Sequence, residues 1–505
     1  MSSMGIDIGT TGCKALVFDG HGRTLASSYR EYPMIHARPG WAELDPAAVC
    51  EACLTVIREA AARVPRDPVT GLGISSQGEA FTAVDEQGRP LCHAMVSSDA
   101  RAAGISREWS GRFGRERLYR ITGHTPHPMF SLFKLLWLRE NCPDVWSGAA
   151  RFLCFEDLLQ LRMGLDPAIG WPLAGRTMLF DIRRHDWSGE ILDAIGLDPC
   201  RLAKPVASGS VAGELPPAMA RELGLVEGAI VVAGGHDQPC GALGAGAIEE
   251  GVAMIGTGTV ECITPAFSAP LQSEALFQAN LCTYDHAARE MYTTVAFCLT
   301  GGNLLRWFRD EFGRQEIAEA ARIGADPYEL LLKQMAPEPT QIMTLPYFTP
   351  SGTPYFDAQT RGAILGLRLT TSRGELLRGL LEGVTLEMRL NLEILNDSGV
   401  AIRELRAVGG GARSAAWMQL KADIFNRPVA RLAVTEAGCL GVAMLAHAAH
   451  SGTPLKILAR EWIAAERRFE PNRARAARYE EIFAKYKKLY PALRDLEHAL
   501  NEEHH

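Results

Sequence analysis

Residues 4–19 read MGIDIGTTGCKALVFD, and this stretch decides the fold. An apolar run that carries Asp7 reaches a small turn of Gly and Thr, and a second apolar run follows. The pattern predicts a β-hairpin whose tip offers backbone N–H groups, two hydroxyls, a cation and a carboxylate. Such a tip suits a polyphosphate and its metal ion. An ordinary hairpin with a polar turn is the alternative unless partner motifs occur further along the chain.

Length and composition bound the remaining possibilities. A chain of 505 residues suggests two or more domains, and 47% apolar with 22% charged residues is typical of a globular protein. The net charge of -7, without a long basic run, does not suggest a nucleic-acid or anionic-membrane partner. No window approaches the ~18 apolar residues of a membrane span, and no signal peptide is recognised. The 12 cysteines are scattered as in reduced proteins, so a cytoplasmic location is expected.

The second half of the chain repeats the pattern of the first. In the first half, the apolar run 229–233 leads into Gly-Gly-His-Asp-Gln at 234–238. The run 251–255 then leads into Gly-Thr-Gly-Thr at 256–259, as the opening hairpin does, and 405–408 leads into Gly-Gly-Gly-Ala-Arg-Ser at 409–414. We interpret this as an internal duplication around a central cleft, with domains at 1–245 and 246–505.

Loops rich in Gly and Thr follow several predicted strands. Glycine allows the backbone to approach phosphate oxygens closely and to point its N–H groups at them. One such loop is weak evidence, but loops at equivalent points of both halves favour a phosphate-binding cleft. The sequence contains neither GxxxxGK[ST] nor GxGxxG, which argues against a P-loop NTPase and a dinucleotide fold.

Asp237 is the candidate catalytic residue. It follows a buried strand and two glycines, at the carboxyl end of the strand, where open α/β sheets place ligands. A carboxylate there could accept the proton of a substrate hydroxyl during phosphoryl transfer. Capping of the following helix is the alternative role.

Together these motifs resemble the FGGY family of carbohydrate kinases, within the actin/hexokinase/Hsp70 ATPase superfamily. The resemblance covers nearly the whole chain, and the motifs occur in the order typical of the family. The matching segments are 7–14, GWAELDP at 40–46, SDAR at 98–101, 122–123 with 134–138, 235–238, 256–257, 301–302 with Trp307, 409–423 and 436–441. It implies an α/β fold of two duplicated ribonuclease H-like domains around a central cleft. The N-terminal domain would carry the sugar side and the base, and the C-terminal domain the nucleotide side.

The resemblance also implies ATP and Mg²⁺, and a role for each matched residue. Asp7 would hold Mg²⁺, and Asp237 would act as general base, with Gln238 bonded to the same substrate. The expected nucleotide-binding residues are Thr10, Thr11, Lys14, Gly256, Thr257, Gly302, Gly410, Gly411, Ala412 and Ser414.

Departures from the family pattern bear on the substrate. Residues 75–79 read SSQGE where xylulose kinases carry GQMH and glycerol kinases NQRE, so Gly78 replaces an arginine. Ser97 replaces the tryptophan of WxDxR, and Met129 replaces a tyrosine that touches glycerol. A ketopentose such as xylulose, a polyol or a sugar acid therefore fits better than glycerol. The expected substrate contacts are Gln77, Glu79, Asp99, Asp237 and Gln238. For Glu79 and Asp99, a loop cap or a structural ion pair is an equal alternative.

Two other functions are compatible with the sequence. One is an actin- or Hsp70-like nucleotide switch, which the sugar-side motifs disfavour. The other is a catalytically weak paralogue that binds sugar without turnover. The resemblance also suggests a possible homodimer.

Overall fold

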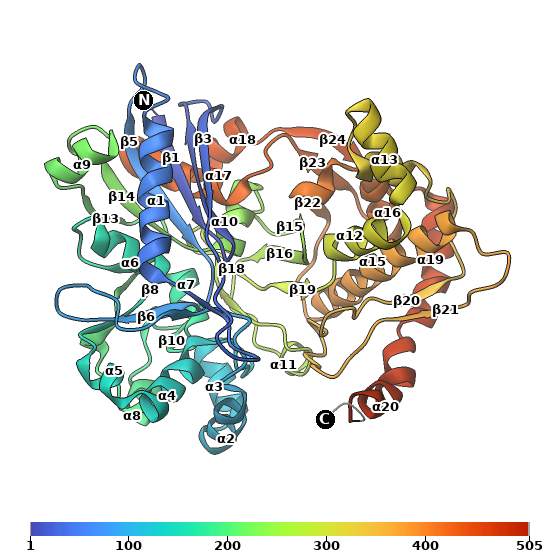
Figure 1. Cartoon of the computed structure of the whole chain (residues 1–505), viewed down its shortest axis with the longest axis horizontal. Coiled ribbons are helices and arrows are strands. Elements are labelled where there is room, and N and C mark those ends of the chain that lie inside the picture. The colour runs from blue at the N-terminus through green and yellow to red at the C-terminus, as the bar shows by residue number, and fades with distance from the viewer. Residues whose placement is uncertain (1, 503–505) are drawn as a thin grey trace.

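Two mixed β-sheets with equivalent strand orders carry the two halves of the chain in this computed structural model, which describes residues 2–502 (Figure 1). The first sheet runs in the order β13-β14-β5-β1-β2-β3, with β1 (Ser2–Ile8), β2 (Gly12–Phe18), β3 (Thr24–Glu31), β5 (Val69–Ser76), β13 (Val211–Glu214) and β14 (Ile230–His236). The second runs β17-β18-β16-β15-β22-β23-β24, with β19 beside β16; its strands are β15 (Val252–Thr257), β16 (Glu261–Phe267), β17 (Tyr284–Asp285), β18 (Tyr292–Thr293), β19 (Ala296–Cys298), β22 (Glu404–Val408), β23 (Val429–Leu432) and β24 (Ala465–Phe469).

Strand directions confirm the predicted duplication. In the first sheet β1 pairs antiparallel with β2 and parallel with β5, and β5 pairs parallel with β14. In the second sheet β15 pairs antiparallel with β16 and parallel with β22, and β22 pairs parallel with β23. Each half therefore opens with a hairpin and continues with two parallel strands, so the fold class predicted from the sequence is confirmed.

Helices from both halves of the chain cover the first sheet. Helix α1 (Pro46–Ala61) starts at Pro46, because the Asp45 side chain accepts from two backbone N–H groups of the first turn and proline suits the first helical position. Helix α17 (Ala437–Ser451) belongs to the second half in sequence but packs against β1, β5 and α10 (Asp237–Gly244), as Figure 1 shows. A Cβ at Gly5 would lie 1.8 Å from the Cys439 carbonyl oxygen, so glycine is what lets this helix approach the sheet so closely.

An insertion between β5 and β14 forms the remainder of the first half. It contributes β6 (Phe81–Val84), β7 (Ala94–Met95) and β8 (Arg151–Cys154) to the sheet β4-β7-β6-β8, whose β4 (Glu43–Leu44) precedes α1 in the chain. Its helices include α2 (Ala103–Phe113), α3 (Arg115–Thr122), α4 (Ser131–Asn141), α5 (Pro143–Gly148), α6 (Phe155–Arg162) and α7 (Trp171–Arg176), which follows β9 (Ala168–Gly170).

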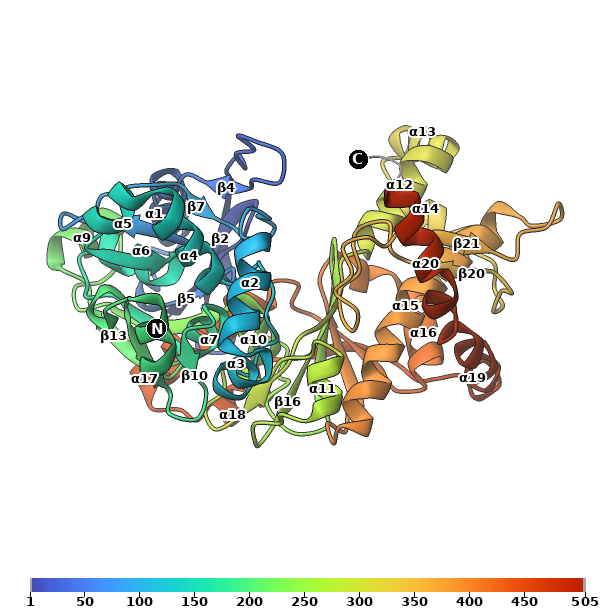
Figure 2. The same cartoon turned by 90° about the horizontal axis from the view of Figure 1, so that it is seen from below.

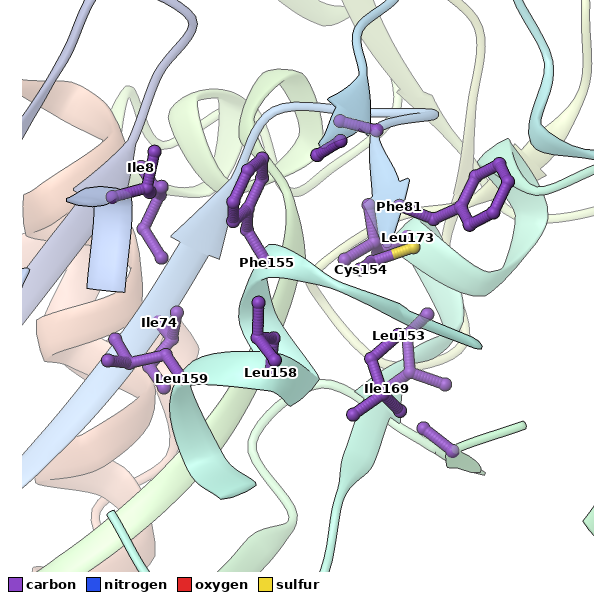
Figure 3. Close-up of a cluster of buried hydrophobic side chains, with 14 of the residues drawn as sticks. Ile8, Ile74, Phe81, Leu153, Cys154, Phe155, Leu158, Leu159, Ile169 and Leu173 are labelled. Carbon is purple, nitrogen blue, oxygen red and sulfur yellow. The ribbon is translucent and has the colours of Figure 1, made fainter. Parts of the chain in front are cut away.

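One hydrophobic core joins this insertion to the main sheet. Ile8 and Ile74 of the sheet share it with Phe155 and Leu158 of α6 and with Leu173 of α7 (Figure 3). Each of these side chains is at most 1% exposed. The core therefore sets where α6 and α7 lie relative to the ends of β1, β5 and β14.

The second half is completed by helices on and beside its sheet (Figure 2). They include α12 (Gly302–Phe312), α13 (Arg314–Ile323), α15 (Arg373–Asp397), α16 (Ala415–Phe425), α19 (Arg473–Tyr486) and α20 (Leu489–Glu502), whereas α18 (Leu455–Trp462) packs with α17. The aromatic side chains near the C-terminus lie on two helices, with Tyr479 and Tyr486 on α19 and Tyr490 on α20. Among residues 2–502, none of the helices has the length and apolar character needed to cross a bilayer.

Candidate active site

The opening hairpin is held rigidly at its tip. The Gly9 amide donates to the Gly12 carbonyl at 3.0 Å, which closes the turn. The side-chain amide of Gln77, just beyond β5, donates to the Gly9 carbonyl at 2.9 Å and accepts from the Thr10 hydroxyl at 3.2 Å. The tip thus leaves Thr11 exposed. Gln77, expected to touch substrate, has its amide engaged with the hairpin that is expected to bind phosphate.

Three glycine segments that are distant in sequence meet in the second half. Gly302, at the start of α12, donates its N–H to the Gly258 carbonyl at 2.9 Å. A Cβ at Gly409 would lie 2.8 Å from the Thr257 carbonyl oxygen, and one at Gly411 would lie 2.3 Å from Thr257 Cγ2. The predicted second phosphate motif and the predicted adenosine motif are therefore in direct contact, and only glycine fits at their interface.

A hollow of about 200 Å³ adjoins this glycine segment. It lies at the carboxyl ends of β22 and β23, and Val408, Gly409, Ala412 and Arg431 are among its lining residues. Gly410 has open space on its side-chain position, as an approaching ligand would require. Ser414, one of the expected nucleotide-binding residues, caps α16 by accepting from the Trp417 amide at 3.2 Å.

Asp7 and Lys14 face each other across the hairpin and offer opposite charges to a metal phosphate. Asp7 pairs in register with Lys14. Burial, together with the charge of Glu436, raises the pKa of Asp7, although the Ser75 hydroxyl donates to it at 2.7 Å. Burial alone would lower the pKa of Lys14, but its 2.8 Å ion pair with Glu436 raises it. Lys14 and Glu436 also join the two halves of the molecule.

These groups fit a magnesium nucleotide. Within residues 2–502, no set of three or more His, Cys, Asp and Glu side chains is arranged to hold a metal ion. Mg²⁺ is commonly held by one or two carboxylates together with substrate phosphates, however, and a buried carboxylate with a raised pKa gains from a cation beside it. Asp7 provides such a carboxylate next to a phosphate-sized turn.

Asp237 is the first residue of α10, at the carboxyl end of β14, where the sequence predicted it. Its side chain is 31% exposed. Burial and the charges of Asp7 and Glu79 raise its pKa to about 7, against a hydrogen bond with Gln238 and the charge of Arg176. His236 Nε2 lies 3.1 Å from Asp237 Oδ1 but is not aligned for a hydrogen bond, so Oδ1 has no partner among the described residues.

His236 is itself held from the other half of the chain. Its Nδ1 lies 2.9 Å from the hydroxyl of Tyr284, on β17. Burial lowers the pKa of His236 well below its ordinary value, so the ring is neutral. If the Tyr284 hydroxyl donates to Nδ1, the proton of the ring stays on Nε2 and faces the Asp237 carboxylate. That tautomer is favoured electrostatically, because the other one would place a lone pair against the carboxylate.

Glu79 and Arg176 form a buried ion pair beside His236. The side chains of Arg176 and Glu79 are 9% and 3% exposed. A Cβ at Gly78 would lie 3.0 Å from His236 Nε2 and 3.4 Å from Arg176 Nε, which explains why residue 78 carries no side chain. Arg176 and Tyr284 were missed at the level of sequence, because neither lies in a motif and each joins the site from a distant element.

Asp99 forms an ion pair as well, as one of the alternatives proposed. Its two oxygens accept from Arg101 Nε at 2.8 Å, from Arg101 Nη2 at 2.7 Å and from the Ala42 amide at 2.8 Å. The Asp99 side chain has no exposed surface, and the Arg101 guanidinium lies 3.6 Å from the centre of the Trp41 ring. A hydroxyl could reach Asp99 only by displacing these partners.

Known proteins match the chain over nearly its whole length. Models of the N- and C-terminal domains of the FGGY family of carbohydrate kinases match residues 2–244 and 251–450. The chain is 28% identical to a xylulose kinase of Bacillus subtilis over 98% of each chain, and 30% identical to a glycerol kinase of Methylibium petroleiphilum over 94% of this chain and 96% of that one.

A solved structure agrees with the sequence matches. The crystal structure of a xyloylose kinase from Brucella ovis is 29% identical, with a TM-score of 0.88 over 98% of this chain and 100% of that one. These relatives favour a kinase over the nucleotide switch considered as a rival. The chain is therefore an enzyme that belongs to the FGGY family of carbohydrate kinases, which use ATP with Mg²⁺ as phosphoryl donor.

Proposed function

We propose that this enzyme transfers the γ-phosphoryl group of ATP to a hydroxyl of a ketopentose such as xylulose, a polyol or a sugar acid, with Asp237 as general base. The acceptor hydroxyl attacks phosphorus, the bond from phosphorus to the β,γ-bridging oxygen breaks, and Asp237 accepts the hydroxyl proton. The products are the phosphorylated carbohydrate and ADP. Xylulose kinases and a gluconokinase of Bacillus subtilis among the relatives support this range of acceptors.

A single observation carries the proposal. The Asp237 side chain lies at the end of β14 and is partly exposed, and its buried Oδ1 has no hydrogen-bond partner among the described residues. A pKa of about 7 means that the group can hold a proton near neutral pH and return it afterwards.

The other residues would bind and orient the reactants. Thr10, Thr11 and Lys14 would contact the phosphates from the first half, and Gly256 and Thr257 from the second. The nucleoside would be accommodated by Gly302, Gly410, Gly411 and Ala412. Ser414, which caps α16, would lie at the rim of this nucleoside site. Asp7 would hold Mg²⁺, which when bound offsets negative charge on the phosphates. Gln238 and Glu79 would bond to substrate hydroxyls, Gln77 would brace the hairpin, and Asp99 would support Arg101.

Replacement of Asp237 tests the base. We expect Asp237→Asn to lower kcat by about 100- to 10,000-fold, the usual contribution of a general base, and Asp237→Ala to act similarly. Binding of Mg²⁺-ATP, measured by calorimetry, should be unchanged, because the nucleotide contacts lie on other residues. Turnover close to that of the wild type in either variant would exclude Asp237 as the base.

A substrate panel separates the rivals. ADP release is measured with Mg²⁺-ATP and a series of ketoses, polyols and aldonic acids. Strong stimulation by one of them supports the kinase. Sugar binding without ADP release would support the weak paralogue, and release indifferent to sugar would support a nucleotide switch.

The homodimer and the cytoplasmic location stay predictions. Light scattering on the eluting peak of a gel-filtration column would test the first, and fractionation of the source cells the second.

A further inference from the structure

An ion pair stands at the place where the substrate is expected to meet the base. Glu79 and Arg176 act electrostatically on Asp237, Glu79 raising its pKa and Arg176 lowering it. The Arg176 guanidinium also lies 5.7 Å from the ring centre of Tyr284, the residue that holds His236. The pair therefore neighbours the reacting end of the site and is not a remote structural bridge.

Unusual backbone geometry occurs at Glu79 itself and close to Arg176 in the chain. Glu79 has φ 63°, in the left-handed region, and Met178, two residues after Arg176, has φ 61°. Such conformations cost free energy in residues other than glycine and are concentrated at functional sites. The Glu79 carbonyl is held by the Ser131 hydroxyl at 2.9 Å and by Lys134 Nζ at 3.4 Å, both from α4.

Arg176 is fixed from the opposite side. It ends α7, whose Leu173 is anchored in the core shown in Figure 3. Its guanidinium lies 4.9 Å from the ring centre of Phe130. Gly78 supplies no side chain and so leaves room for Arg176 Nε, which a Cβ there would approach to 3.4 Å. Arg176, from α7, thus lies beside residue 78, the position at which glycerol kinases carry the arginine of NQRE.

The charged groups that act most strongly on Asp237 are mostly carboxylates, and Lys134, the other cation near Glu79, donates to three backbone carbonyl oxygens. The carboxylates of Asp7, Glu79 and Asp237 face one cation, Arg176, in the set of groups that act most strongly on Asp237. The neighbouring His124 and His236 are neutral, because burial lowers the pKa of each. Arg176 is already neutralised by Glu79, so an added carboxylate would meet repulsion that no free cation there offsets.

We infer that the Glu79–Arg176 pair selects the substrate: Glu79 accepts and Arg176 donates hydrogen bonds to hydroxyls of a neutral polyol or ketose, and the pair excludes sugar acids. This inference rests on the proposed function and narrows its range of acceptors. Arg176 becomes a substrate-binding residue that no sequence motif marks.

The charge-neutral variant Glu79→Gln tests the pair, because it keeps the shape of Glu79 and frees the charge of Arg176. We measure kcat/KM for a pentitol, a ketopentose and the matching pentonate, with their six-carbon counterparts. The wild type should favour the best neutral substrate over its matching aldonate by at least about tenfold. Glu79→Gln should lower kcat/KM for the neutral substrate and shift this ratio by about tenfold or more toward the aldonate, because Arg176 can then pair with its carboxylate.

A matched control uses another buried pair of the same kind. Arg378 and Glu382 on α15 are 4% and 1% exposed and lie in the second half of the chain. Glu382→Gln should leave the neutral-to-aldonate ratio at the wild-type value, whatever it does to stability. Thermal melting of each variant shows that it is folded.

The outcomes separate this inference from the proposed function. Preference of the wild type for aldonates, or an unchanged ratio in Glu79→Gln, would overturn the selecting role while leaving phosphorylation by Asp237 intact. Calorimetric binding of the same sugars is measured in parallel. Binding that is selective for neutral sugars without turnover of any of them would contradict the base at Asp237 and support the selecting pair.

Discussion

At the scale of single residues, the site depends on a carboxylate whose protonation changes near neutral pH. The pKa of Asp237 is raised to about 7, and its conjugate base is the active form. We therefore expect kcat/KM for the sugar to fall about tenfold for each pH unit below 7 and to reach a plateau above it. Initial rates at saturating Mg²⁺-ATP across the pH range measure this. A profile that is flat between about pH 5 and 8 would contradict it.

The same pKa has a consequence for stability. A carboxyl whose pKa in the folded state lies above its ordinary value of 3.8 binds its proton more tightly when the protein is folded. The free energy of unfolding therefore falls as the pH rises from 3.8 to about 7. We expect Asp237→Asn to raise the melting temperature at about pH 8 relative to the wild type, and to change it little at about pH 3. Equal shifts at both values would show that burial of the charge does not matter.

Tyr284 should affect the pKa of Asp237 through His236, and it should not affect the binding of the nucleotide. Tyr284→Phe removes the hydroxyl that is hydrogen-bonded to His236 Nδ1 and so frees the ring to change tautomer. We expect kcat to fall by up to about tenfold, the worth of one buried hydrogen bond, and the acidic limb of the pH profile to move to higher pH. Tyr292→Phe, on the neighbouring strand β18, is the control. A lower kcat with an unmoved pH limb would assign Tyr284 a merely structural role.

At the scale of elements, a buried ion pair ties the hairpin of the second half to its adenosine motif. Lys421 Nζ of α16 lies 2.5 Å from Glu261 Oε2 of β16, and neither side chain is exposed. Burial raises the pKa of Glu261 and lowers that of Lys421, so neither charge is tolerated alone. The pair therefore makes β16 and α16 depend on each other.

Replacing one partner of this ion pair should destabilise the protein more than replacing both partners. We expect Lys421→Met to destabilise the protein by about 3–5 kcal/mol, because the Glu261 carboxylate stays buried without a partner. The double variant Lys421→Met with Glu261→Leu should recover most of that loss. Urea unfolding followed by tryptophan fluorescence measures both. A double variant no more stable than the single one would contradict the argument.

At the scale of the whole molecule, two helices from different halves cross at glycines. A Cβ at Gly244 of α10 would lie 1.9 Å from the Ala437 carbonyl oxygen, and one at Gly441 of α17 would lie 2.1 Å from the Cys240 carbonyl oxygen. Because α10 begins with Asp237, the crossing links the position of the proposed base to the other half of the chain.

Widening this crossing should affect stability and catalysis together. We expect Gly441→Ala to destabilise the protein by about 1–3 kcal/mol through overpacking and to lower kcat, since α10 must shift. Gly104→Ala in α2, where a Cβ meets nothing within 4 Å, is the control and should be neutral or slightly stabilising. Melting curves and steady-state rates report both effects. Unchanged values for Gly441→Ala would show that the crossing is compliant.

The sequence by itself determined the parts of this protein that depend on local backbone geometry. The apolar runs and the Gly and Thr turns that follow them predicted the two hairpins and the duplication, because hydrogen bonds between near neighbours set these features. The position of Asp237 at the end of a buried strand was predicted for the same reason.

Only the tertiary structure decided which distant groups meet around these motifs. Arg176 reaches Glu79 across 97 positions, and Tyr284 reaches His236 across 48. Helix α17 follows most strands of the second sheet in the chain but packs against the first sheet. The glycines at this contact cannot be recognised as necessary until the neighbouring element is known. Such contacts depend on how layers pack around shared cores and not on the pattern within any one segment. The charge balance beside the substrate is therefore a property of the folded chain alone.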